Sequence, residues 1–101
     1  MAAETSRSIF EWGHDTFGDV TDLNRVIARA RLEFDELAEA VAQGHAPDEI
    51  AKEAADVAIL LHRLMGLMGR ELGEEVDAKM KINRARTWLR NGDGTGRHVK
   101  P

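Results

Sequence analysis

The sequence predicts an all-α protein, a helical bundle of about four helices. The composition is rich in Ala, Leu, Glu and Arg and poor in β-branched runs, which favours helix over strand. Apolar residues recur every three or four positions along the middle of the chain, and Gly or Pro interrupts this pattern near residues 44–47 and 69–73. Because 101 residues give one domain with a modest core, we expect dimerisation to complete the bundle.

The first helix is expected over residues 5–14, followed by a break at residues 16–19. Trp12 and Phe17 lie on either side of the start of this break. Two interpretations remain open for these rings. They can pack in the core or a dimer interface, or one of them can stack on a flat ligand such as a nucleobase.

The second and third helices are expected over about residues 22–43 and 47–69. Gly44 can adopt the left-handed conformation that ends a helix, and Pro47 suits the first turn of the next one. The short connection between them predicts an antiparallel helical hairpin. Each helix has an apolar face that must be buried.

Four carboxylates on this predicted hairpin are the main functional signal. Glu33 and Glu36 lie three residues apart on the second helix, and Glu53 and Asp56 have the same spacing on the third. At 3.6 residues per turn, each pair lies on one side of its helix, so the hairpin predicts a box of four carboxylates. Glu53 falls within the apolar face, where an unpaired charge costs several kcal/mol, so a cation is expected there.

A fourth helix is expected over residues 73–90, with a polar flank beside a narrow apolar stripe. Lys79, Asn83, Arg86 and Arg90 follow this flank at spacings of four, three and four. Such a row is usually solvated, but next to a carboxylate box it can bind the phosphates of a metal-bound ligand.

Residues 1–90 are therefore interpreted as a single helical domain, and residues 91–101 as a Gly-rich C-terminal tail. The tail does not have the spacing of a phosphate-binding P-loop. It is either disordered, or it closes over a bound ligand or a neighbouring subunit through Arg97, His98 or Lys100.

Composition excludes several classes of function. The net charge of −4 argues against broad binding of nucleic acid. The absence of cysteine excludes disulfides and thiolate metal sites and suits a reducing compartment. The first residues have no basic and apolar leader pattern, and no apolar run approaches membrane-spanning length, so a cytoplasmic protein that does not bind membranes is expected.

The ligand chemistry favours Mg²⁺, for which Mn²⁺ can substitute, because both ions prefer oxygen ligands. Di-iron helical bundles also use carboxylates, but they need Glu-x-x-His pairs, and the corresponding position here is Asp56. Carboxylates beside a cationic helix predict a polyphosphate substrate attacked in line by water.

These motifs resemble the MazG-like all-α nucleoside triphosphate pyrophosphohydrolases, whose superfamily includes dimeric dUTPases. The resemblance covers about residues 8–90 and rests on ExxE, a sixteen-residue spacer, ExxD and Lys79-x-x-x-Asn83-x-x-Arg86-x-Trp88. The segment from Trp12 to Gly18 and the late Gly-Asp-Gly-Thr-Gly-x-His are similar to the small phage-type branch acting on dATP and dGTP, the MazZ proteins.

The resemblance implies cleavage of a nucleoside triphosphate, preferentially dGTP or dATP, to the monophosphate and pyrophosphate. It implies catalytic Mg²⁺ ligands at Glu33, Glu36, Glu53 and Asp56. It also implies phosphate contacts from Lys79, Asn83 and Arg86. Base-binding residues are predicted at Trp12, Phe17, Trp88 and His98.

The resemblance further implies a homodimer, or a dimer of dimers, in which two chains complete each pocket. If the protein is phage-encoded, its compartment is the host cytoplasm. Many relatives begin the first motif with two adjacent acids, and the first of those positions here is Leu32, so the number of metal ions and the general base stay open. Two alternative functions also stay open: a pyrophosphohydrolase for pyrimidine deoxynucleotides, and a non-catalytic acidic helical module that binds a basic partner.

Overall fold

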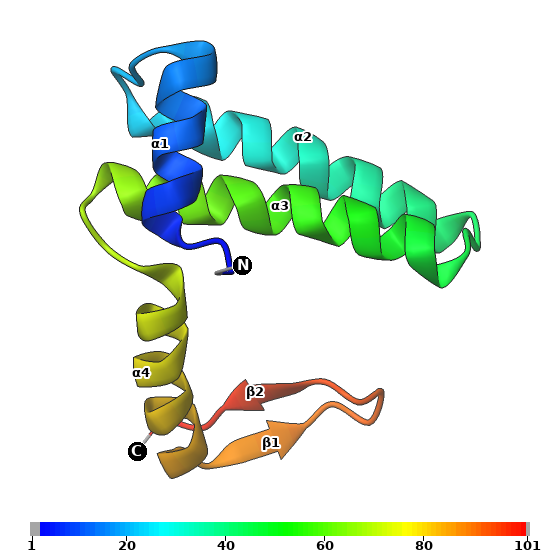
Figure 1. Ribbon diagram of the computed structural model, residues 1–101. Helices are drawn as coiled ribbons and strands as arrows, with labels where there is room; N and C mark the ends of the chain where they lie inside the picture. The colour runs from blue at the N-terminus through cyan, green and yellow to red at the C-terminus, as the bar shows by residue number, and fades with distance from the viewer. Residues whose placement is uncertain (1–2, 101) are drawn as a thin grey trace.

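The computed structural model describes residues 3–100, so the first two residues of the predicted domain and the last residue of the predicted tail lie outside it. Within these residues the four predicted helices are present, and a two-stranded antiparallel sheet follows them (Figure 1). The elements are α1 (Ser6–Phe17), α2 (Leu23–Ala42), α3 (Pro47–Leu67), α4 (Leu72–Ala85), β1 (Trp88–Arg90) and β2 (Gly96–His98).

The α2–α3 hairpin forms as the sequence predicts. The Asp22 side chain caps α2 by accepting a hydrogen bond from the Asn24 N–H at 2.9 Å. Gly44 has a φ of 68°, which is the left-handed conformation that ends α2, and Pro47 opens the first turn of α3. The two helices pack side by side along their length and bring the two acidic motifs onto neighbouring helices (Figure 1).

Helix α1 crosses α3 and is longer than the sequence predicts. The predicted break at residues 16–19 starts too early, because α1 continues through Phe17 and ends at Gly18, whose φ of 88° favours glycine. Close backbone approach fixes the crossing. A Cβ on Gly66 would lie 2.4 Å from the Phe10 Cβ, so a larger residue does not fit there.

A buried serine joins α1 to the start of α4. Ser6 is fully buried, and its Oγ accepts a hydrogen bond from the Leu72 N–H at 2.8 Å and lies 2.8 Å from His62 Nδ1. In return, both carboxylate oxygens of Glu71 accept from the Ser6 N–H at 3.0 Å. Each helix therefore caps the N-terminus of the other.

The fourth helix and the tail differ from the sequence prediction. Helix α4 ends at Ala85 and not at Arg90, because Arg86 turns to an extended backbone (φ −86°, ψ 157°) and the Trp88 indole N–H donates to the Asn83 carbonyl at 2.8 Å. The chain then forms a hairpin that pairs Trp88 with His98. The interpretation of this segment as a disordered tail is wrong, since the glycines in its turn supply the positive φ angles of 94° and 91° that a tight connection needs.

We call α1 to α3 the body and α4 with its hairpin the arm. Helix α4 leaves the body at the end of α3 and runs away from the α2–α3 pair, and the hairpin that follows extends back below that pair (Figure 1). Within residues 3–100 the buried apolar side chains are few: Ile9, Val26 and Ala40. Large apolar side chains stay exposed on the arm, such as Val76, Ile82 and Leu89, which are 48–49% exposed. Across the described part of the chain, none of the helices is long and apolar enough to cross a bilayer.

Candidate metal centre

Three acidic side chains converge in the middle of the α2–α3 hairpin. Glu33 on α2 and Glu53 and Asp56 on α3 each offer a carboxylate oxygen, and these oxygens lie within 4.8 Å of one another. Their burial decreases in this order: Glu33 is buried, Glu53 is half-buried and Asp56 is exposed. The cluster is therefore open on one side, as a site that exchanges a ligand must be.

Glu33 is the most buried member, although the sequence pattern singled out Glu53 as the carboxylate within an apolar face. It is 8% exposed, and its nearest cation is Arg29, one turn earlier on α2, whose Nη2 lies 2.8 Å from Glu33 Oε1. Burial raises the pKa of the Glu33 carboxyl above its ordinary value, and the carboxyls of Glu36 and Asp56 raise this pKa further. Arg29 lowers the pKa but does not cancel these effects.

The carboxylates of the cluster are short of cationic partners. Glu53 Oε2 is buried and has no hydrogen-bond partner among the described residues, which is costly for a carboxylate oxygen. Converging carboxylates raise the energy of the site unless a cation binds between them. Oxygen ligands at this separation suit a hard divalent ion, so the residues present fit Mg²⁺ or Mn²⁺.

Glu36, the fourth predicted ligand, lies beside this cluster and not within it. Its side chain is exposed, and a hydrogen bond with Glu33 contributes to the raised pKa of that residue. The described residues thus bring three of the four predicted carboxylates together, with Glu36 next to Glu33. A role for Glu36 as a ligand stays a prediction.

A cavity of about 460 Å³ extends from the carboxylates toward α1. The Trp12 and Phe17 rings meet edge to face in its wall, with their centroids 5.5 Å apart. Both rings are more than half exposed, so they are free to contact a ligand. The cavity is lined by Trp12, Phe17, Arg29, Glu33, Asp56, Ile59, Leu60 and Arg63. Two of the predicted base-binding aromatic residues therefore share a cavity with two of the predicted metal ligands.

The other predicted site residues lie on the arm and do not line this cavity. Lys79 is exposed on α4, and Asn83 and Arg86 are half-buried near its end. Trp88 and His98 face each other across the hairpin with ring centroids 5.9 Å apart. One chain therefore separates its phosphate-binding candidates from its carboxylates.

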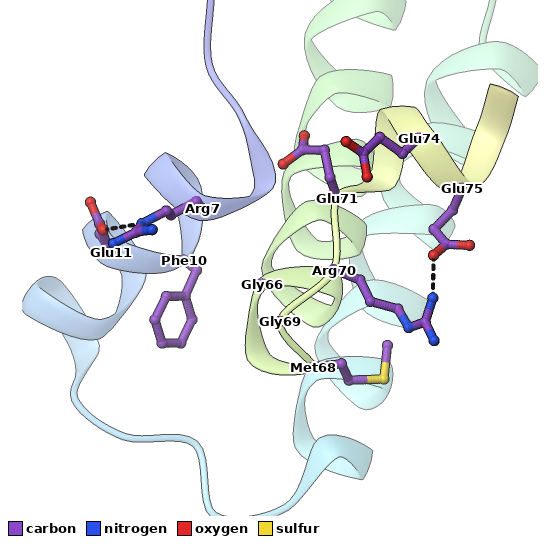
Figure 2. A pocket seen from close by; sticks show the side chains of 10 residues that line it. All are labelled: Arg7, Phe10, Glu11, Gly66, Met68, Gly69, Arg70, Glu71, Glu74 and Glu75. Atoms are coloured by element: carbon purple, nitrogen blue, oxygen red, sulfur yellow. Dashed lines mark hydrogen bonds and ion pairs between the residues drawn. The ribbon is translucent and has the colours of Figure 1, made fainter.

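A larger cavity, of about 690 Å³, lies at the junction of α1, α3 and α4 (Figure 2). Its charges are largely paired: Arg7 bonds to Glu11 at 3.0 Å, and Arg70 bonds to Glu75 at 2.6 Å. Glu71, also in its wall, accepts a hydrogen bond from the Ser6 N–H. Size alone would select this cavity, but two carboxylates of the cluster, Glu33 with its raised pKa and Asp56, line the smaller one, which is the better candidate site.

Two arginines near the carboxylates were missed at the level of sequence. Arg29 had a signal, because a cation four residues before Glu33 on a helix is a neighbour of that residue. Arg63 had no clear local signal, since its place depends on α1 crossing α3. His62 is packed against Ser6 and takes no part in the carboxylate cluster.

Comparison with known proteins identifies what this arrangement is similar to. A family model described as dATP/dGTP pyrophosphohydrolase matches residues 5–100. A dATP/dGTP diphosphohydrolase of cyanophage S-2L is 42% identical over 66 residues, which are 65% of this chain and 61% of the relative. Another, of Salmonella phage PMBT28, is 39% identical over 97 residues, which are 96% of this chain and 31% of the relative. The chain thus matches less than two thirds of the length of either relative.

A solved structure is also similar over almost the whole chain. It is that of a cyanophage S-2L MazG-like pyrophosphohydrolase bound to dGDP and three catalytic Mn²⁺ ions per active site. The TM-score is 0.73 at 35% sequence identity, and the match covers 95% of this chain and 90% of that one.

Proposed function

The chain belongs to the dATP/dGTP pyrophosphohydrolase family, and from this membership we propose that it hydrolyses purine deoxynucleoside triphosphates, dGTP and dATP, to the monophosphate and pyrophosphate. The observation that carries the proposal is the cluster of Glu33, Glu53 and Asp56, whose oxygens lie within 4.8 Å beside a cavity with an aromatic wall. The relatives with this activity in their names and the dGDP-bound neighbour support it.

Glu33, Glu53 and Asp56 would hold divalent ions, Mg²⁺ or Mn²⁺, with Glu36 as an additional ligand. Such ions, when bound, offset the phosphate charge and make a nearby water more acidic. The neighbour's three Mn²⁺ ions per active site support more than one ion here. The buried Glu53 oxygen without a partner supports a cation at this point, because an unpaired buried carboxylate oxygen is costly.

The reaction consumes one water. The water oxygen forms a bond to the α-phosphorus, the bond from that phosphorus to the α–β bridging oxygen breaks, and pyrophosphate leaves with the electron pair. The water proton passes to a carboxylate of the cluster or to solvent.

Trp12 and Phe17 would form the base side of the site, since both line the cavity that begins at Glu33 and Asp56. An aromatic face stacks on any base, so these rings contribute affinity more than selectivity. Trp88 and His98, on the hairpin, are proposed to contact the base or to cover it from a second chain.

The phosphate-binding residues Lys79, Asn83 and Arg86 are proposed to act on the site of a partner chain. The arm carries exposed apolar side chains, and its helix α4 runs away from the α2–α3 pair, which is the arrangement expected of a segment that packs on a second copy. A homodimer, or a dimer of dimers, would both cover these side chains and complete each site. The phage origin of the relatives supports action in the cytoplasm of an infected host.

The experiment that tests this function combines product analysis with one isosteric substitution. The wild type should release pyrophosphate, and not orthophosphate, from dGTP or dATP when Mg²⁺ or Mn²⁺ is present. Glu53→Gln should lose more than about 100-fold in turnover, which exceeds the loss expected from residues that only support a metal ligand. Its far-ultraviolet circular dichroism should stay helical, because the side-chain volume is unchanged.

Glu49→Gln is a matched control, since it makes the same change one turn earlier on α3 and outside the cluster. Full turnover by Glu53→Gln would remove the carboxylate cluster from the mechanism. An acidic module that only binds a basic partner would show no metal-dependent hydrolysis, and its unfolding midpoint would not rise with Mg²⁺ concentration. Equal turnover of dCTP and dTTP would instead favour a pyrimidine substrate.

A further inference from the structure

We infer that Arg63 reads the purine base and makes the enzyme favour guanine over adenine. The inference rests on the proposed function and adds a specificity-determining residue to it. Arg63 lies on α3 seven residues after Asp56, hence on the same side of the helix and about 10 Å further along its axis. This span is comparable with the length of a nucleoside, and the same cavity joins the two side chains.

The Arg63 guanidinium forms part of the aromatic wall of that cavity. Its central carbon lies over the Phe17 ring, 5.3 Å from the ring centroid. The Phe17 ring in turn meets Trp12 edge to face. A planar cation held on an aromatic ring has its direction restricted, so its donors point to a defined place.

The hydrogen bonds of Arg63 within residues 3–100 do not use its two Nη1 donors. Both come from Nη2, at 3.4 Å to the Gly13 carbonyl and 3.5 Å to the Gly18 carbonyl, and both are near the limit of a hydrogen bond. Nε is buried without a partner. Because the two Nη2 bonds are long and weak, a ligand with two adjacent acceptors can be bound by Nη1 together with one Nη2 donor that gives up its long contact.

Purines carry such acceptors on one edge. Guanine presents N7 and O6 side by side, whereas adenine presents N7 next to an amino donor. Arg63 can therefore donate once to either purine through N7 and twice to guanine. Pyrimidines have no N7, so the same residue also discriminates against them.

A purely structural role for Arg63 makes different predictions. Its two long bonds reach the carbonyls of Gly13 in α1 and of Gly18 directly after it, where a cation stabilises the helix end. If that were its whole role, losing Arg63 would lower the unfolding midpoint and affect every substrate equally. The ratio of kcat/KM for dGTP and dATP separates the two roles, because a change in stability alone does not alter this ratio.

The experiment measures kcat/KM for dGTP, dATP and 7-deaza-dGTP, which has no N7 acceptor, in the wild-type protein with Mg²⁺. We expect the wild type to favour dGTP over dATP and over 7-deaza-dGTP by about 5- to 100-fold each, the range for one good base contact. Arg63→Met should lose the preference for dGTP and become insensitive to the N7 replacement. Arg63→Gln should shift the preference toward dATP, since an amide matches the adenine edge.

Gly13→Ala provides a second variant that keeps the arginine. A Cβ at Gly13 would lie 2.6 Å from Arg63 Nε and 3.0 Å from its Cδ, so the side chain must move. The dGTP-to-dATP ratio should fall in this variant although charge and composition of the site are unchanged. Gly73→Ala, where a Cβ meets nothing within 4 Å, is the matched control and should keep the ratio.

The outcomes distinguish this inference from the proposed function. If the wild type hydrolyses no nucleotide, both are wrong. If it hydrolyses purine deoxynucleotides and all Arg63 variants keep the wild-type dGTP-to-dATP ratio and the same loss on 7-deaza-dGTP, only the role of Arg63 is overturned.

Discussion

The body and the arm of this chain differ in how their side chains are packed. In the body, α1 and α2 pack on α3 and bring Glu33, Glu53 and Asp56 together. The arm meets the body mainly at the Ser6–Glu71 joint, and its apolar side chains stay exposed. The body thus contains a carboxylate cluster that one chain can build, whereas the arm leaves its large apolar side chains uncovered by its own chain.

The largest effect on activity is expected from two variants, one that damages the body and one that damages the arm. Glu53→Gln damages the body and Arg86→Ala damages the arm, and each should remove most activity from a pure preparation. If the arm acts on a partner's site, mixing and refolding the two variants should restore about a quarter of wild-type activity. Half of the randomly paired dimers are then mixed, and each of these has one intact site out of two.

Steady-state pyrophosphate release from the mixture measures this recovery. Mixing either variant with itself after the same refolding step is the control. No recovery in the mixture would mean that carboxylates and phosphate-binding residues of one site come from the same chain.

A charge on the arm should affect association more than folding. Ile82 is 48% exposed on α4, and Ile82→Asp should cost several kcal/mol of association if a second chain buries this side chain. Light scattering at a fixed concentration should show a smaller species than the wild type. Lys81→Asp, the same residue introduced at the neighbouring position, should keep the wild-type size, and an unchanged size for Ile82→Asp would mean that the arm does not lie in an interface.

The joint between body and arm should show an intermediate effect on stability. Ser6→Ala removes the acceptor of the Leu72 N–H and the hydroxyl next to His62, which leaves buried groups without partners. We expect a loss of about 1–3 kcal/mol in the free energy of unfolding. Ser8→Ala, which removes an exposed hydroxyl of the α1 capping box, should cost about 1 kcal/mol or less. Chemical denaturation of both variants measures these free energies. Equal losses in the two variants would mean that the buried hydrogen bonds of Ser6 add no special stability.

The smallest effect is a pH dependence that belongs to the body alone. Because the pKa of Glu33 is raised in the folded protein, the folded state binds its proton more tightly than the unfolded state does. This contribution to stability is full below the ordinary carboxyl pKa and is lost as pH rises through the folded pKa. In metal-free protein, the unfolding midpoint of Glu33→Gln should therefore rise relative to that of the wild type as pH increases from about 4 to 7.

Melting curves of both proteins in chelator test this difference. Adding Mg²⁺ at pH 7 should reduce it, because a cation offsets the charge of the wild-type carboxylates. A difference that is constant over the whole pH range would indicate that Glu33 does not change its affinity for protons on folding.

Sequence reasoning succeeded where neighbouring residues decide the structure. The α2–α3 hairpin follows from Asp22, Gly44 and Pro47, each of which acts within one helical turn. The acidic motifs are also local, since a spacing of three residues puts two carboxylates on one side of a helix. The sequence prediction of a helix up to residue 90 was wrong after Ala85. The hairpin there requires Trp88 to pair with His98, ten residues further along the chain.

The sequence by itself thus determined the four helices, the acidic motifs and the family, because helical period and capping are properties of short segments. Only the tertiary structure decided which carboxylates converge, that Glu33 and not Glu53 is the most buried, and that Trp12, Phe17 and Arg63 share a cavity with Glu33 and Asp56. These facts depend on how α1 crosses α3 and on how deeply α2 packs. Such packing is set by the summed contacts of residues far apart in the chain, which no short pattern contains.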